Sequence, residues 1–141
     1  MDEKIKQAIF RQVEKEPFAV KLGLELLELD LGYSKVGMSF TEDMKNIHGM
    51  AHGGALFALI DQAFETSSNS HGTVAVALSM TVNYHATPSL GTRLVAEAKE
   101  FARTKRTAHY DIKVYDGNDR LIASCTALVY RKQEPLSFLS E

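Results

Sequence analysis

One stretch, from residue 46 to residue 64, places the tightest constraint on how this chain folds. It begins as a glycine-containing loop with two histidines, and from Gly53 onward it has the composition of a helix. Between Gly53 and Phe64 the only charged residue is Asp61. A helix that is apolar nearly all round is a buried helix, and an ionised acid inside it is costly unless something specific binds it. Asp61 therefore stands where packing alone would favour a leucine.

The residues on either side of this helix alternate in the manner of β-strands. A short amphipathic helix comes first, and Pro17 stops it at or before Glu16. Residues 22–40 predict a hairpin that turns near Gly32. Four strands are predicted after the helix, and the tail from Gln133 has no clear period and is expected to be loose. In the first of these strands, alternation predicts one face made of residues 74, 76, 78, 80, 82 and 84, and another made of residues 75, 77, 79, 81 and 83.

This order of elements predicts the class of fold. One helix, two strands, a long buried helix and four strands favour an α+β protein with a single sheet packed on a central helix. A single six-stranded sheet leaves edges that can pair with another chain, so we expect a dimer. The length of 141 residues suits one domain, over residues 1–141.

Composition excludes several classes of function. A net charge of −2 argues against nucleic acid as a partner, because phosphate binding needs a basic surface. No apolar run reaches the length of a membrane span, and the charged N-terminus lacks the core of a secretion signal. One cysteine, Cys125, cannot form an internal disulfide and fits the reducing cytoplasm. Its strand-like surroundings favour a core residue rather than a nucleophile.

Two histidines in the central stretch raise the question of metal. His48 and His52 have the i, i+4 spacing that binds zinc when both lie on one helix. Here a glycine interrupts them within a loop, and no third ligand is evident. We therefore predict no metal site.

The central stretch also carries a family resemblance, which extends over roughly the last two thirds of the chain. It is similar to the signature of the hotdog-fold thioesterases, in particular the phenylacetate-degradation (PaaI-type) acyl-coenzyme A thioesterase family. The matching residues are Asn46, His48-Gly49, His52-Gly53-Gly54, Asp61, Ala63-Phe64 to Asn69-Ser70, Tyr84, Pro88, Gly91 and Tyr110-Asp111.

The resemblance implies a fold, a reaction and an assembly. The expected fold is the hotdog, an antiparallel six-stranded sheet wrapped around one long central helix. The expected reaction is hydrolysis of an acyl- or aryl-CoA to a free acid and CoA in the cytoplasm, with no metal or bound cofactor. The expected assembly is a homodimer with active sites at its interface, extended to a dimer of dimers, that is, a homotetramer. The alternatives are a non-catalytic acyl-CoA-binding hotdog protein and a hotdog dehydratase.

Four residues are the candidates for catalysis. Asp61, held in a partly dry site, is expected to have a raised pKa and to act as base or nucleophile; a helix acid bonded to nearby backbone is the alternative. Gly53 lies at the helix N-terminus, where a free N–H can stabilise an oxyanion, or it simply starts the helix. His52 and Asn46 are expected to position the carbonyl or the water, the alternative being ordinary loop polarity.

Four further residues are predicted to bind substrate. Gly54 adds bare backbone that lets another group approach closely. In related thioesterases a strand hydroxyl often completes the site, and aligning through Tyr84 puts Ala77 at that position. Ser79 is expected on the same strand face and is the candidate substitute. Lys105 and Arg106, in a basic turn where the family commonly has glycine at position 104, are predicted to meet CoA phosphates, although a solvated turn explains them equally well.

Overall fold

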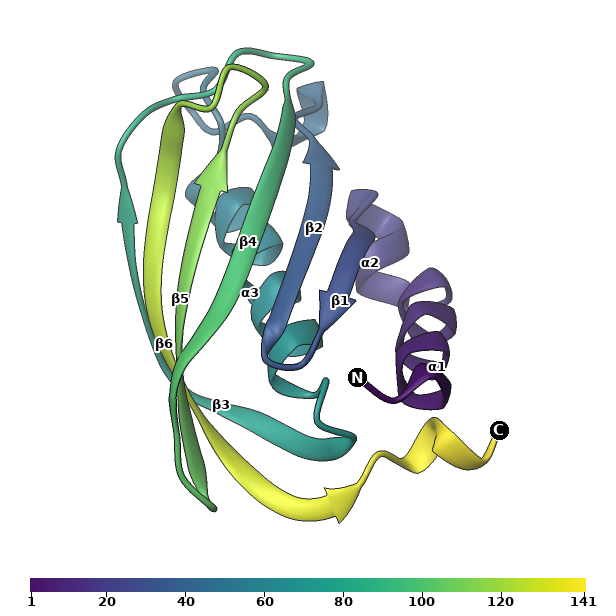
Figure 1. The fold of residues 1–141 in the computed structure, drawn as a ribbon. Helices are drawn as coiled ribbons and strands as arrows, with labels where there is room; N and C mark the ends of the chain where they lie inside the picture. Colours follow the sequence, from purple (N-terminus) through teal and green to yellow (C-terminus); the bar gives the residue numbers. More distant parts are fainter.

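The computed structural model describes residues 1–141 as a curved antiparallel sheet that wraps around one central helix, which is the hotdog arrangement (Figure 1). The predicted fold class is confirmed. Along the sheet the strand order is β1-β2-β4-β5-β6-β3, so the last strand of the chain lies inside the sheet and β3 forms one edge. The strands are β1 Glu25–Asp30, β2 Tyr33–Ser39, β3 Thr73–Tyr84, β4 Arg93–Arg103, β5 Thr107–Tyr115 and β6 Leu121–Pro135.

The central helix, α3, spans Gly53–Ser68 and buries only part of its circumference. Its inward side chains join the core against the concave face of the sheet. The outward row is different, because Phe57, Asp61 and Glu65 recur at i, i+4 and i+8 and all three residues are exposed. The expectation of a helix buried all round is therefore wrong in the single chain. The inward core positions are Leu56, Leu59, Ile60, Ala63 and Phe64.

The edge strand β3 departs from simple alternation. Ala77 pairs with Val129, but Ser79 pairs with the preceding residue of β6, Leu128, so a β-bulge lies at Leu78. Residues directly opposite each other in a sheet share a face. Ala77 therefore shares the concave face with buried Val129, whereas Ser79 lies on the convex face with Leu128. The prediction of two unbroken faces along this strand is wrong beyond residue 77.

The N-terminal segment forms two helices rather than one. Helix α1 spans Glu3–Glu14, in agreement with the prediction, and Asp2 caps it by accepting from the Lys4 and Ile5 N–H groups. A second helix, α2, spans Pro17–Leu22 and was not predicted. Pro17 occupies its first turn, where a missing N–H costs nothing. The same proline that ends one helix thus begins the next.

The C-terminal tail is ordered, so the expectation of a loose tail is wrong. Strand β6 continues to Pro135, and the Leu136 N–H donates to the Gly72 carbonyl at 3.1 Å. A short 3-10 helix, η2, Ser137–Ser140, then lies beside α1 (Figure 1). A second short 3-10 helix, η1, Glu42–Met44, interrupts the loop before α3. None of the helices has the length and apolarity needed to cross a membrane.

Candidate active site

Asp61 lies on the outward row of α3, beside the edge strand. A recess of about 220 Å³ separates the helix from β3, and the Asp61 side chain forms part of its wall. Ala77 forms another part of this wall, so the position at which a hydroxyl was expected does line the same recess as Asp61 but carries only a methyl group. The full lining is Asp61, Phe64, Glu65, Ser68, Asn69, Ala75, Val76, Ala77 and Val129.

The environment of Asp61 favours its protonated form. Although the residue is exposed in the single chain, burial by neighbouring atoms raises the pKa of its carboxyl, and the Glu16 carboxylate raises that pKa further. Because a higher pKa means a higher affinity for a proton, both effects make the Asp61 carboxylate a stronger base. A raised pKa on an acid in a recess is typical of a catalytic group.

Glu65 is a candidate functional residue that the sequence reasoning missed. It follows Asp61 by four residues, so it lies on the same row of the helix. Burial, the Glu16 carboxyl and Asp61 together raise the pKa of Glu65 well above its usual range. The Glu16 carboxylate also accepts a hydrogen bond from Gln62 Nε2 at 2.9 Å. The i, i+4 spacing was readable in the sequence, whereas the approach of Glu16 from the N-terminal segment was not.

The N-terminus of α3 presents one free backbone donor. His52 is the N-cap, and its Nδ1 accepts from the Gly54 N–H at 2.8 Å, which places the ring proton on Nε2. The Gly53 N–H has no acceptor in the chain. The Gly53 carbonyl accepts from the Tyr84 hydroxyl at 3.1 Å. The helix start therefore offers the Gly53 amide to a ligand, while the Gly54 amide is already taken by His52.

Asn46 holds the loop that leads into the helix. Its Oδ1 accepts from the His48 and Met50 N–H groups at 2.9 and 3.1 Å, and its own backbone N–H donates to the Met50 carbonyl at 2.7 Å. The side-chain amide nitrogen makes no hydrogen bond within the chain. That NH₂ group remains available as a donor to another molecule.

These groups do not converge within one chain. Asp61 follows Gly53 by eight residues in the same helix, which corresponds to about 12 Å along its axis at about 1.5 Å per residue. A thioester carbonyl cannot contact both at once. Asn46, His52 and Gly53 thus lie together at one end of α3, and Asp61 lies two turns away.

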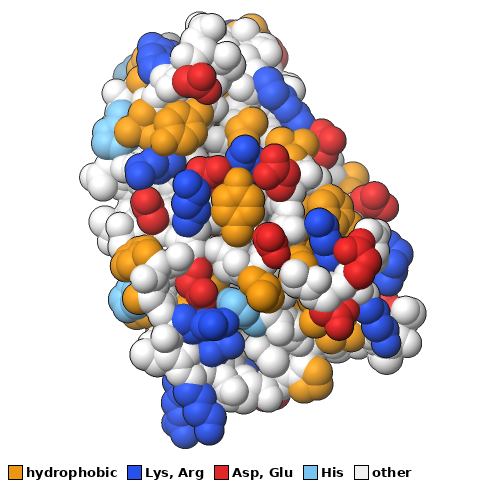
Figure 2. All heavy atoms as spheres, in the orientation of Figure 1, with side chains coloured by type: hydrophobic (Ala, Val, Ile, Leu, Met, Phe, Trp, Pro, Cys, Tyr) orange, Lys and Arg blue, Asp and Glu red, His pale blue; other side chains and the backbone are white.

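Ser79 and the basic turn occupy other positions. The bulge at Leu78 puts Ser79 on the convex face, so the prediction that it shares a face with Ala77 is wrong. Lys105 and Arg106 are exposed at the turn between β4 and β5, and Arg131 braces this turn by donating from Nη1 to the Thr104 carbonyl at 2.8 Å. Lys and Arg side chains gather at this end of the molecule (Figure 2).

The structure brings no set of metal ligands together. His48 is exposed in the loop, and no group of three or more His, Cys, Asp or Glu side chains has the arrangement of a metal site. Cofactor independence stays a prediction.

Comparison with known proteins gives a consistent result. The thioesterase superfamily matches residues 48–123. A relative from Archaeoglobus fulgidus is 39% identical over 113 residues, which are 80% of this chain and 73% of the relative. The acyl-coenzyme A thioesterase PaaI of Escherichia coli is 33% identical over 87% of this chain and 88% of its own length.

The solved structures agree. The structure of E. coli PaaI superposes with a TM-score of 0.91 at 30% identity, covering 96% of this chain and 98% of that one. A Streptococcus mutans protein bound to acetyl-CoA superposes with a TM-score of 0.76 at 25% identity, over 80% of this chain and 91% of that one.

Proposed function

Since the chain belongs to the thioesterase superfamily, as a PaaI-type hotdog thioesterase, we propose that Asp61 is the group that drives its hydrolysis of acyl-CoA. The enzyme cleaves the thioester bond of an acyl-CoA to a free acid and CoA. The observation that carries the assignment of Asp61 is its place in the recess beside β3, with a pKa raised by burial and by Glu16.

In this proposal Asp61 acts as a general base. Its carboxylate takes a proton from water as the water oxygen bonds to the thioester carbon. The resulting oxyanion then collapses, the C–S bond breaks, and the departing CoA sulfur receives the proton from Asp61. Direct attack by Asp61 would instead form a mixed anhydride, which hydroxylamine would trap as a hydroxamate on that side chain.

The start of α3 supplies the complementary groups. The Gly53 N–H, at the positive end of the helix dipole, donates to the oxyanion. The free NH₂ of Asn46 and the Nε2–H of His52 position the carbonyl and the water. Gly54 lets the substrate approach the backbone closely, because it has no side chain. It does not donate a hydrogen bond to the substrate, because its N–H already donates to His52.

A second copy of the chain is needed to assemble this site. Asp61 and the Gly53 group are about 12 Å apart within one helix, whereas two α3 helices packed antiparallel through their outward rows would bring one chain's Gly53 to the other chain's Asp61. Strand β3 supports this pairing, since the edge of the sheet that it forms has no partner in the chain. Such an interface would bury Phe57 and Asp61, which are exposed in the single chain. Helix α3 would then be buried nearly all round, as its composition predicts. We infer a homodimer with two interfacial sites, and a dimer of dimers is the corresponding larger assembly.

The basic turn is the proposed contact for the CoA nucleotide. Lys105 and Arg106 are exposed and held by Arg131, which gives CoA phosphates a preformed cationic surface. The enzyme needs no cofactor in this proposal, because CoA arrives as part of the substrate. A cytoplasmic location is included because CoA esters and the free thiol of Cys125 both belong to a reducing compartment.

The test is a thiol-release assay across short, medium, long and aryl acyl-CoA substrates, with Asp61→Asn beside the wild type. The substitution keeps the shape of the side chain and removes the base, so we expect kcat to fall by about 10²-fold or more with substrate binding largely kept. A near wild-type rate for Asp61→Asn would refute the role of this residue. Absence of thiol release from every substrate with the wild type would refute the function itself.

A further inference from the structure

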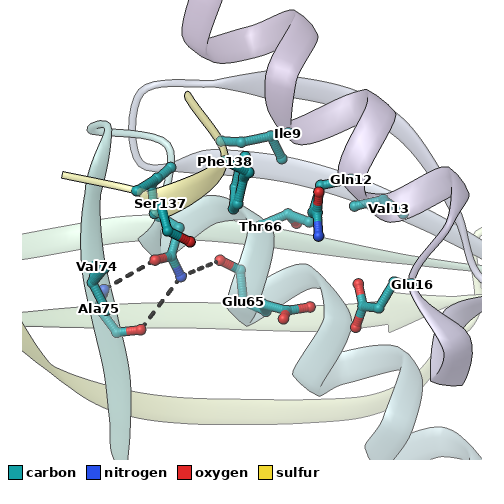
Figure 3. A pocket seen from close by; sticks show the side chains of 12 residues that line it. Ile9, Gln12, Val13, Glu16, Glu65, Thr66, Val74, Ala75, Ser137 and Phe138 are labelled. Atoms are coloured by element: carbon teal, nitrogen blue, oxygen red, sulfur yellow. Dashed lines mark hydrogen bonds between the residues drawn. The ribbon is translucent and has the colours of Figure 1, made fainter. Parts of the chain in front are cut away.

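A second cavity lies directly behind the recess of Asp61. It encloses about 270 Å³ between α1, the C-terminal half of α3, the start of β3 and the C-terminal segment (Figure 3). Apolar side chains from α1, β3 and the C-terminal segment form half of its lining, and α3 contributes only polar or charged ones. The lining residues are Ile9, Gln12, Val13, Glu16, Glu65, Thr66, Asn69, Val74, Ala75, Leu136, Ser137 and Phe138.

The cavity and the recess share part of their walls. Glu65, Asn69 and Ala75 line both, so the two spaces meet at Glu65, one helical turn beyond Asp61. A thioester whose carbonyl lies at Asp61 can direct its acyl group past Glu65 into the cavity. A cavity of about 150 Å³ already accommodates benzene, so this one has room for a six-carbon acyl group.

Hydrogen bonds hold the walls of this cavity in place. Asn69 links the end of α3 to β3, because its Nδ2 donates to the Glu65 carbonyl at 2.9 Å and its Oδ1 accepts from the Ala75 N–H at 2.9 Å (Figure 3). On the opposite side, the bond from Leu136 N–H to the Gly72 carbonyl fixes the C-terminal segment. The space is therefore preformed rather than dependent on the ligand.

Charge at the junction restricts what can pass. The carboxyl groups of Glu16 and Glu65 point toward one another and lie side by side in the wall of the cavity (Figure 3), and Gln62 supplies a hydrogen bond to Glu16. No cationic side chain lines the cavity or the recess. A carboxylate on the far end of an acyl group would enter a region that already holds acidic groups and no compensating positive charge.

We propose that this cavity receives the acyl group of the substrate, and that Glu16 and Glu65 make it selective for uncharged acyl groups of about six carbons over dicarboxylic ones. The inference rests on the proposed role of Asp61, because that residue fixes where the carbonyl lies. It assigns substrate specificity to the N-terminal helix and the C-terminal segment.

The test compares hexanoyl-CoA with adipyl-CoA, which has the same number of acyl carbons and ends in a carboxylate. For the wild type we expect kcat/KM to be about 10²-fold higher for hexanoyl-CoA, from repulsion between the adipyl carboxylate and the Glu16 carboxylate about 5 Å apart at an effective dielectric constant of about 20. In Glu16→Gln/Glu65→Gln this ratio should fall at least tenfold. The control Glu3→Gln/Glu14→Gln likewise replaces two carboxyl groups, but on the exposed side of α1, and should keep the wild-type ratio.

A second variant tests the cavity without changing charge. Phe138→Ala enlarges the cavity from the C-terminal segment, and we expect the ratio of kcat/KM for decanoyl-CoA to that for hexanoyl-CoA to rise at least threefold. If the wild type hydrolyses hexanoyl-CoA and adipyl-CoA equally well, or if neither ratio responds to its variant, the inference is overturned while the thioesterase function stands. If both kcat/KM ratios stay unchanged and the variants have an altered oligomeric state, the cavity is a contact surface for a partner subunit. That result also overturns the inference. If the wild type hydrolyses no acyl-CoA, the proposed function itself is overturned.

Discussion

Two inactive variants should restore activity to one another if the site is shared between subunits. Asn46→Ala removes the acceptor of two loop hydrogen bonds, at a cost of about 1 kcal/mol each, which is small beside a typical unfolding free energy of about 5–15 kcal/mol. The variant should therefore fold and lose only its positioning group. Asp61→Ala removes the base at the other end of the helix segment, about 12 Å away. Each homodimer then holds two damaged sites.

In a mixed dimer the two lesions fall in the same site. One site lacks both Asn46 and Asp61, and the other is intact, so a purified heterodimer should show about half of the wild-type specific activity. Random association makes about half of the dimers mixed, so the unsorted mixture should show about a quarter.

The assay uses co-expression of the two variants with different tags, sequential affinity purification and thiol release measured beside each parent. A heterodimer no more active than its parents would refute the shared site. A nearly normal rate for Asn46→Ala alone would remove Asn46 from the site.

Three further predictions follow from the charges and burial. Burial and the acidic neighbours Glu16 and Asp61 raise the pKa of Glu65 in the folded chain, so its ionisation destabilises the fold as pH rises above the unfolded value of about 4.3. Glu65→Gln should therefore raise Tm more at pH 8 than at pH 4, and equal shifts in a melting series would contradict this. Lys105→Gln/Arg106→Gln should raise KM for acyl-CoA about tenfold with little effect on kcat, whereas the N-acetylcysteamine thioester, which lacks the nucleotide, should be unaffected. Cys125 is 3% exposed and burial raises its pKa to about 11, so a disulfide reagent at pH 8 should leave the native thiol unmodified and react only on unfolding.

The elements that periodicity could identify were predicted well. The alternating stretches became strands, and Gly32 turns the first hairpin with a positive φ of 64°. Helix α2 was not predicted, because Pro17 was interpreted only as the residue that ends the preceding helix. The ordered conformation of the C-terminal tail was not predicted either. It depends on contacts with α1 and Gly72, which no local sequence pattern encodes.

The site was harder to predict than the fold. The spacing of Gly53 and Asp61 predicted that one helix holds both residues, as α3 does, but the bulge at Leu78 reversed the face of Ser79. One extra residue in a strand changes the side of every residue after it, and its presence depends on pairing with β6 rather than on composition. Glu16 reaches Glu65 across 49 positions of sequence, a proximity that arises only when the N-cap of α2 comes to lie beside α3 in the folded chain.

The strand order has a consequence for how the chain is made. Strand β6 lies between β5 and β3, so β3 has no place in the sheet until β6 has been synthesised. While the ribosome is still adding β6, β3 has no partner on either side, and its ladder groups are exposed to other chains. Once β6 has emerged, β3 and β6 can pair over ten registered positions. We infer that the fold, and with it the Asp61 recess between α3 and β3, closes only after β6 has emerged from the ribosome.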